Sequence, residues 1–352
     1  MPVINAEELK NLSIEIFKSI GASEEDASII SEYLVEANLT GHDSHGVIRI
    51  EQYNRSVKNE LTAPQAVVEV VKETPTTAVV DGNWGFGQVI GKKAMELAVR
   101  KAEMNGIAAV AVRHCNHLGR LADYSSIAVE RNMIGFMVTN SSPLVAPFGG
   151  VERVLSTNPI CFGIPTGRKP SFMLDMATSA RAEGKIRVRR NRNEKVPLGW
   201  LLDKEGNPTE DPNDLYEGGA MLPFGDEVAY KAMGLGMVVD FLGGALTESG
   251  CSSSEEYRTP GGSNGTFIIV INVPWFTLVK DFKRRTDEVI KNVKNAKKQH
   301  GVDEIFVAGE IERKTKEKRL DEGIYISDIT WESIKTIAEE NGLNVEEYVR
   351  LM

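Results

Sequence analysis

The sequence predicts a mixed α/β protein. From about residue 62 onward, short apolar runs typical of strands alternate with longer segments of helical periodicity. Helical patterns also occupy both ends of the chain, and we find no internal repeat and no coiled-coil heptads. Because 352 residues exceed the usual size of one hydrophobic core, we expect two or three subdomains.

Residues 6–40 have apolar positions three and four apart, which predicts helices. Gly21 interrupts this pattern, and Ser23 followed by Asp26 resembles an N-cap with its acidic partner. The second helix is expected to end near Gly41. A third helix is expected to begin at Asp43 or Ser44 and to run through Tyr53.

Strands and helices then alternate. The strands are expected at 66–71, 77–81, 107–112 and 133–139, and the helices between them at 90–104 and 120–131. A long section rich in Gly and Pro, 140–226, is expected to be irregular.

The last third of the chain predicts a buried, Gly-containing helix at 228–248 and a polar loop at 249–265. The strongly apolar run 266–272 predicts a strand. The elements expected after it are an amphipathic basic helix at 278–298, a strand at 303–308 and helices at 329–341 and 344–352.

Composition narrows the class of protein. The formal charge of −9 argues against a nucleic-acid-binding surface, so an anionic ligand would need a local basic cluster. The three widely spaced cysteines, Cys115, Cys161 and Cys251, fit reduced thiols in the cytoplasm. No signal peptide is expected at the N-terminus. The longest apolar stretch, 232–246, contains Asp240 and is shorter than a membrane span, so no membrane partner is expected.

Four of the five histidines lie in two Gly-flanked clusters, at 41–46 and 113–119. Histidine both gives and takes a proton near neutral pH, so this concentration favours a reaction centre over polar loops that happen to carry His. Arg49 lies four residues after His45, a spacing that puts both side chains on one helix face. An imidazolium can protonate a carbonyl oxygen while a guanidinium binds a carboxylate, a pairing that suits a 2-oxo acid.

Other patterns are weaker. Gly85-x-Gly87-x-x-x-Gly91 mimics a dinucleotide fingerprint, but the next strand leads to Arg113 and His114 with no acidic residue for a ribose, so a tight turn is the better interpretation. Ser44 is wrongly spaced for a nucleophile elbow. His114 and His117 have no second ligand pair, so no metal is expected.

The basic run 187–195 is interpreted as a solvated loop, with a nucleotide phosphate or a subunit contact as alternatives.

Five ordered motifs resemble one family over nearly the whole chain. They are Gly41-His-Asp-Ser-His-Gly-Val-Ile-Arg49, Asn116-His-Leu-Gly119, Asn140-Ser-Ser-Pro-Leu-Val-Ala-Pro147, Ser156-Thr-Asn-Pro-Ile160 and Leu174-Asp-Met-Ala-Thr178. The chain therefore resembles the type-2 malate/L-lactate dehydrogenases, which include malate, L-sulfolactate and ureidoglycolate dehydrogenases, and is most similar to their archaeal malate and sulfolactate members.

The resemblance implies a non-Rossmann NAD(P)-binding fold with a helical domain built from both chain ends. We place that domain at 1–65 plus 315–352, a mixed α/β domain at 66–138 plus 266–314, and a mixed domain completing the site at 139–265. The resemblance also implies a homodimer with its active site near the subunit interface.

Roles carried over by matching motif remain implied by the resemblance. Either His45 or His117 is the acid/base, with His45 favoured, and Ser44 supports proton transfer. Arg49 holds the substrate carboxylate, and Thr157 lies at the substrate. The positions matching cofactor contacts are His117, Leu118, Gly119, Leu121, Ser141, Asp175, Met176, Ala177, Lys231, Gly309 and Glu310.

This chain departs from the family near Lys231, where two neighbours differ, and at Ala308, where the family has Pro. The expected reaction interconverts a 2-oxo acid and a 2-hydroxy acid with NAD or NADP, oxaloacetate and (S)-malate above all. The alternatives are L-sulfolactate dehydrogenase, an imine or diketo-acid reductase, and a non-catalytic metal- or ligand-binding protein.

Overall fold

The computed structural model describes residues 2–254 and 264–350. Within them, seven strands form one sheet in the order β2-β3-β4-β11-β5-β6-β7. Only β3 and β4 are parallel neighbours, and the other pairs are antiparallel. The predicted mixed α/β class is confirmed, and a Rossmann sheet, which is mostly parallel, is excluded. The strands are β2 (Glu69–Glu73), β3 (Thr77–Gly85), β4 (Ile107–Cys115), β11 (Thr266–Asn272), β5 (Met133–Thr139), β6 (Ile160–Ile164) and β7 (Phe172–Met176).

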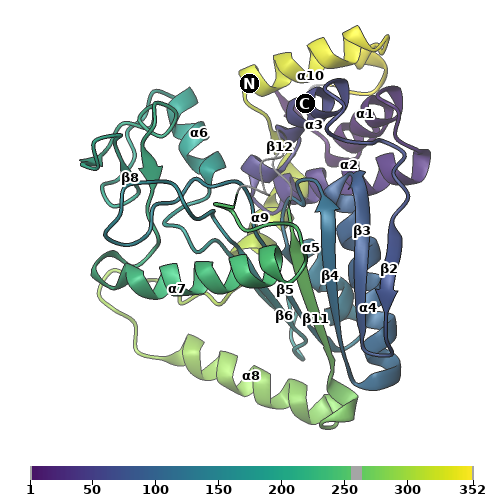
Figure 1. Cartoon of the computed structure of the whole chain (residues 1–352), viewed down its shortest axis with the longest axis vertical. Coiled ribbons are helices and arrows are strands. Elements are labelled where there is room, and N and C mark those ends of the chain that lie inside the picture. Colours follow the sequence, from purple (N-terminus) through teal and green to yellow (C-terminus); the bar gives the residue numbers. More distant parts are fainter. Residues whose placement is uncertain (1, 255–263, 351–352) are drawn as a thin grey trace.

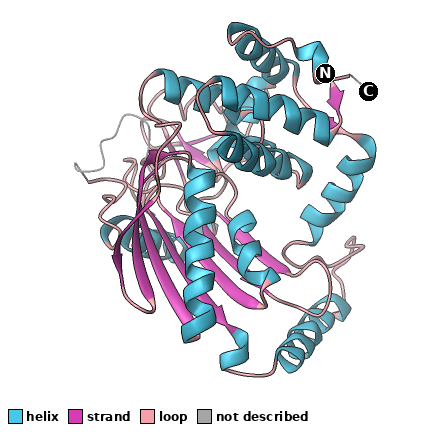
Figure 2. Ribbon diagram, turned by 90° about the vertical axis from the view of Figure 1, so that its right-hand side faces the viewer, coloured by secondary structure: helices cyan, strands magenta, loops and turns pink. Residues whose placement is uncertain are grey.

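Strand β11 lies in the centre of the sheet although it comes late in the chain. Its residues alternate between buried and half-buried positions, as expected for a strand packed on both sides. Helices α4 (Gly87–Asn105) and α5 (Ala122–Glu130) bury their apolar sides with Ile268 and Val270 in one hydrophobic cluster. Figure 2 shows the strands as one twisted layer with helices packed along it.

A helical layer contains both ends of the chain, which lie close together in Figure 1. It contains α1 (Ala6–Ser19), α2 (Glu24–Leu39), α3 (Arg49–Lys58) and α10 (Asp328–Glu340), and β1 (Val3–Ile4) pairs with β12 (Ile324–Tyr325). The predicted N-cap is confirmed, because Ser23 Oγ accepts a hydrogen bond from the Asp26 amide at 3.1 Å.

The third helix was predicted too early. Asp43–His45 form a short 3-10 turn, Gly46 is extended, and α3 begins only at Arg49. Asn38 stabilises this turn, since its amide donates to Asp43 Oδ1 at 2.7 Å and its Oδ1 accepts from the Val47 amide at 2.8 Å. Side chain-to-backbone bonds of this kind favour turns over a continuous helix.

The section 140–226 is more regular than predicted. It contains β6, β7 and helix α6 (Glu183–Asn191), with the short strands β8 (Leu201–Leu202), β9 (Pro208–Thr209) and β10 (Ala220–Met221). Ile186, Val145 and Met221 contribute to a separate small apolar cluster under α6. The frequent Gly and Pro residues concealed these elements because some of them, such as Gly163 in β6 and Gly184 in α6, lie inside the elements themselves.

Several predictions for the last third of the chain are wrong. Residues 303–308 form no strand, and helix α9 (Glu310–Glu322) follows them. The expected helix 344–352 is a single 3-10 turn, Val345–Glu347, and residues 351–352 lie outside the described residues, as does part of the loop 249–265. Helix α9 was missed because its charged sequence has no apolar stripe, and none of its residues is buried.

The glycine-rich pattern after β3 has a structural cause. A Cβ on Gly87 would lie 2.3 Å from the carbonyl oxygen of His117 and 2.4 Å from that of Asn116. One on Gly91 would lie 2.7 Å from both the Leu118 and Tyr124 side chains. These glycines let α4 approach the segment that carries His117, so they belong to the packing around the site and not to a dinucleotide fingerprint.

The helix expected to be buried at 228–248 is largely exposed. It is α7 (Ala229–Asp240) followed by a π-helical turn, Phe241–Ala245. Leu235, Met237, Val238 and Phe241 are exposed on it. Among the described residues, Asp226–Ala245 is the one helix long and apolar enough to cross a membrane by length and composition, a test that core helices of soluble proteins also pass. The helix α8 (Val279–Asn295) has no buried residue.

Candidate active site

Two adjoining cavities lie where the helical layer, the sheet and α6 meet. The first has a volume of about 610 Å³ and is lined by His45, Arg49, His117, Ser141 and Thr157 among others. The second, of about 350 Å³, is lined by Ser44, Asp175, Met176 and Ala177. His45, Gly119 and Thr157 line both, so the cavities form one continuous cleft.

Most of the predicted site residues therefore lie together. Leu118 lines the first cavity and Leu121 the second. Lys231, Gly309 and Glu310 line neither cavity. Lys231 is exposed on α7, with its ammonium 5.9 Å from the ring of Tyr230, and Glu310 pairs with Lys294 at 2.6 Å.

Two of the four clustered histidines converge. The rings of His45 and His117 are stacked with centroids 5.7 Å apart. His42 lines the second cavity, with its Nε2 3.6 Å from Glu312 of α9, whereas His114 lines neither cavity and contacts Asp81 at 2.9 Å. Within residues 2–254 and 264–350, no group of three or more His, Cys, Asp or Glu side chains could hold a metal ion.

Arg49 is buried beside these rings. Its Nε donates to the Ser44 carbonyl at 2.7 Å and its Nη1 to Gln52 Oε1 at 2.5 Å, so both partners are neutral. His45 and Arg49 were predicted to share one helix face, but His45 lies in the 3-10 turn and Arg49 begins α3. Both side chains still reach the first cavity, and the hydrogen bond from Arg49 to the Ser44 carbonyl links the helix to the turn. Burial, and then the nearby charge of Arg187, lower the pKa of Arg49.

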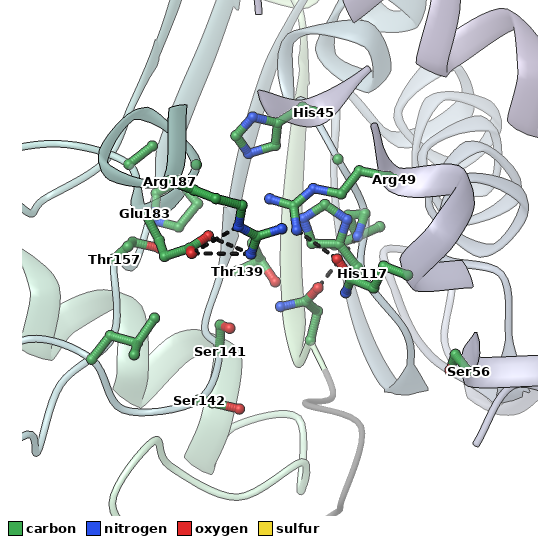
Figure 3. Close-up of a pocket in the computed structure, with 18 of the residues that line it drawn as sticks. His45, Arg49, Ser56, His117, Thr139, Ser141, Ser142, Thr157, Glu183 and Arg187 are labelled. Atoms are coloured by element: carbon green, nitrogen blue, oxygen red, sulfur yellow. Dashed lines mark hydrogen bonds and ion pairs between the residues drawn. The ribbon is translucent and has the colours of Figure 1, made fainter. Parts of the chain in front are cut away.

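Arg187 on α6 is a second guanidinium in the same cavity. Figure 3 shows Arg49 and Arg187 reaching toward each other across the pocket, with His45 above them. Glu183 binds Arg187 through both carboxylate oxygens at 2.9–3.1 Å, and Tyr216 donates to Glu183 at 2.7 Å. Such bidentate pairing holds the guanidinium in a defined orientation.

Sequence reasoning missed the roles of Glu183, Tyr216 and Gln52. The basic run 187–195 was the available signal, but only its first residue, Arg187, lines the cavity; Arg189 and Arg190 lie over the rings of Trp200 and Tyr216. Gly184 brings α6 to the site, because a Cβ there would lie 2.3 Å from Ser44 Cβ.

The two histidines are neutral in the free protein. The pKa of His45 is lowered from 6.5 to about 3, and the pKa of His117 is lowered well below its usual value. Burial is the main cause of both shifts, and the charge of Arg49 is the next. Ser44 Oγ lies 2.9 Å from His45 Nδ1. The cleft therefore holds uncharged imidazoles next to the Arg187–Glu183 ion pair and to Arg49, whose hydrogen-bond partners are neutral, so the charge of Arg49 is the one that attracts an anion.

The second cavity is lined by basic side chains that could hold an anionic group. Arg120, Arg181 and Lys185 line it, in a chain whose net charge is −9. Asp175 also lines this cavity, and its Oδ2 accepts a hydrogen bond from the Ala122 amide at 2.9 Å. Basic side chains in this position suit phosphate groups.

Comparison with known proteins identifies the family. The sequence profile described as malate/L-lactate dehydrogenase matches residues 4–335. The chain is 41% identical to the L-sulfolactate dehydrogenase of Methanocaldococcus jannaschii, over 99% of both chains. It is 39% identical to the malate dehydrogenase of Pyrococcus abyssi, over 97% of this chain and 95% of the relative. The crystal structure of malate dehydrogenase from Entamoeba histolytica superposes with a TM-score of 0.93 at 31% identity, covering 97% of this chain and 98% of the other.

The lowered pKa of His45 predicts a pH-dependent stability. Above pH 6.5 the His45 ring is neutral in both the folded and the unfolded states. Below pH 6.5 the unfolded state takes up a proton that the folded state does not. The free energy of unfolding therefore decreases as the pH is lowered. Because one ring edge faces the open cavity, we expect a slope of about 0.5–1 kcal/mol per pH unit, below the full ~1.4.

Replacing His45 by Gln should remove that component. Urea unfolding of the wild type and of His45→Gln, between pH 7 and pH 5, measures the free energy of unfolding at each pH. Other groups titrate in both proteins, so the contribution of His45 is the difference between the two slopes of free energy against pH. Parallel curves for the two proteins would show that His45 is not held neutral by burial.

Proposed function

The chain belongs to the malate/L-lactate dehydrogenase family, and we propose that it interconverts a 2-oxo acid and a 2-hydroxy acid with NAD or NADP. Its relatives are 2-hydroxy acid dehydrogenases, so the chain is an enzyme. The observation that carries the proposal is the convergence of His45, His117 and the buried Arg49 on one cleft. Together they meet the two needs of a 2-oxo acid, since the histidines serve the carbonyl oxygen and Arg49 is a cation for the carboxylate.

We propose Arg49 as the carboxylate ligand and His45 as the acid/base. When bound, the nicotinamide cofactor supplies a hydride to the carbonyl carbon or accepts one from the alcohol. Arg49 binds the carboxylate and so helps to orient the carbonyl; the whole site, by holding both reactants in place, can lower the barrier by about 7–11 kcal/mol. The carboxylate also offsets the charge that lowers the pKa of His45, so the imidazole takes up a proton from water and passes it to the carbonyl oxygen.

Ser44 supports His45 in this proposal through the contact between its hydroxyl and Nδ1. Thr157, from the loop before β6, faces both cavities and is proposed to lie at the substrate. The cofactor is proposed to lie along the second cavity, against Gly119, Leu121 and Asp175 to Ala177, with Ser141 and Leu118 on the adjoining wall.

The second guanidinium favours a substrate with two anionic groups. Glu183 already offsets the charge of Arg187, so Arg187 serves as a hydrogen-bond donor to the second anionic group of a dianion such as oxaloacetate or malate, while Arg49 supplies the charge for the first. Sulfopyruvate and sulfolactate carry the same charges, and they fit equally well. A cyclic imine or a diketo acid remains an alternative within the family, and a non-catalytic ligand-binding protein is the alternative outside it.

We also propose a homodimer. The occupant proposed for the exposed apolar faces of α7 and α8 is a second copy of this chain, since Phe241 is 55% exposed and Phe276, just before α8, is 69% exposed.

A cytoplasmic location fits the reduced cysteines that the sequence predicts.

Assays of nicotinamide absorbance with oxaloacetate, sulfopyruvate and pyruvate, each with NADH and NADPH, test the activity. We expect turnover of a dianionic oxo acid to exceed that of pyruvate. His45→Ala and His117→Ala should each lower kcat by about 10²–10⁴-fold, because each removes a group proposed to act at the carbonyl oxygen. Arg49→Gln should mainly raise KM for the oxo acid, by about 10–100-fold.

Arg131→Gln is the matched control, since Arg131 is an exposed residue directly after α5 whose one ion pair among the described residues is with Glu103. It should keep wild-type kinetics. Near-wild-type kinetics in all three site variants, or no consumption of any oxo acid with either cofactor, would contradict the assignment.

The dimer is tested by sedimentation equilibrium of the wild-type protein and of Phe241→Asp. We expect a dimer for the wild type and dissociation toward monomer for the variant, because a charge is costly in an apolar interface. A monomeric wild type at micromolar concentration would rule out this use of the α7 face.

A further inference from the structure

We propose that Tyr53, held by Gln88, is a positioning residue that keeps the hydrogen of neutral His117 on Nε2. His117 then presents an N–H donor to the substrate cavity. The catalytic meaning of this arrangement rests on the proposed function, but the arrangement itself is a property of the free protein.

The three side chains form a chain of short hydrogen bonds from separate elements. Tyr53 Oη of α3 lies 2.7 Å from His117 Nδ1, in the segment after β4. Gln88 Nε2, in the first turn of α4, donates to the same Oη at 2.7 Å. Gln88 is 1% exposed and Tyr53 5% exposed, so water competes little for either bond.

Counting hydrogens gives the direction of the chain. The phenol has one hydrogen, and the Gln88 amide occupies a lone pair of its oxygen, so the hydroxyl donates toward Nδ1. The His117 carbonyl, at 3.4 Å, is a weaker second acceptor for it. Nδ1 is then an acceptor, and a neutral imidazole with Nδ1 accepting carries its hydrogen on Nε2. Burial raises the pKa of Tyr53 to about 12, so the hydroxyl keeps its hydrogen at neutral pH.

Packing fixes the tyrosine in this position. Its ring centroid lies 6.2 Å from that of Phe17, 6.3 Å from that of Phe86 and 6.0 Å from that of His117. Tyr53 also follows Arg49 by four residues on α3, so the same helix face presents the guanidinium and the hydroxyl. One helix therefore positions the carboxylate ligand directly and His117 through the phenol.

This tautomer separates the roles of the two histidines. An Nε2–H of His117 can donate a hydrogen bond to the carbonyl oxygen of the oxo acid and polarise it. It cannot accept the hydroxyl proton in the reverse reaction while Nε2 holds its own hydrogen. That proton goes to His45, because the Ser44 hydroxyl beside His45 Nδ1 can accept as well as donate and so does not fix a hydrogen on Nε2.

Nitrogen-15 NMR of the histidine-labelled free protein tests the proposal directly. The protein contains five histidines, so the signals of His117 can be assigned by their loss in His117→Gln. At neutral pH we expect a neutral ring with hydrogen on Nε2 and an unprotonated, hydrogen-bonded Nδ1. A ring with hydrogen on Nδ1, which is what the reverse orientation of the Gln88 amide would produce, overturns the proposal.

Tyr53→Phe removes only the hydroxyl. We expect the His117 signals to become a mixture of tautomers and kcat to fall about tenfold, the effect of losing one hydrogen bond to the reacting oxygen, with KM for the oxo acid nearly unchanged. Tyr33→Phe is the matched control, because Tyr33 is a partly buried tyrosine of α2 that packs on Tyr124 and lines neither cavity. It should leave both the spectrum and kcat as in the wild type.

An unchanged His117 spectrum in a folded Tyr53→Phe protein contradicts the role of the phenol. The wild-type spectrum decides the tautomer even if the variant does not fold. Absence of dehydrogenase activity would defeat the proposed function and leave the tautomer measurement intact, so the two failures are distinguishable.

Discussion

The site depends on one buried charge. Arg49 is a guanidinium inside the protein whose hydrogen-bond partners, the Ser44 carbonyl and the Gln52 amide, are both neutral. A buried cation without a counter-ion is unfavourable, and its charge adds to burial, which is the main cause, in keeping the neighbouring imidazoles uncharged. An incoming carboxylate relieves both conditions at once. Binding of the oxo acid and protonation of its proton donor are therefore coupled through a single electrostatic interaction.

The fold brings this charge together with groups from distant parts of the chain. The 3-10 turn held by Asn38 presents Ser44 and His45, and α3 presents Arg49 and Tyr53. The segment after β4 presents His117, pressed against α4 at Gly87. Helix α6 adds Arg187 and reaches the turn only because Gly184 lacks a side chain. The apolar clusters of the helical layer, the sheet and the α6 region thus each contribute one wall of the cleft.

Local sequence carried part of this information. Periodicity predicted α1, α2, β4, β5 and β11 well, and the histidine clusters with Arg49 pointed to the cleft. It did not show that His42 and His114 turn to Glu312 and Asp81, because those partners are distant in the chain. Glu183, Tyr216 and Gln88 were equally out of reach, since common polar residues acquire a role only through tertiary contact. The strand predicted at 303–308 and the missed helix α9 show that apolar pattern fails where little is buried. The family resemblance supplied what pattern could not, and the matching profile over residues 4–335 confirmed it.

Proton uptake on binding of a 2-oxo acid analogue is the most direct measurement of the central claim. Oxamate is titrated into the protein with NADH at pH 7 in two buffers that differ in ionisation enthalpy, and the difference in heat gives the protons exchanged. The account predicts uptake of up to about one proton per site, because the carboxylate offsets the charge of Arg49, which together with burial, the main cause, lowers the pKa of His45 in the free protein. Tight binding with no proton uptake would contradict it.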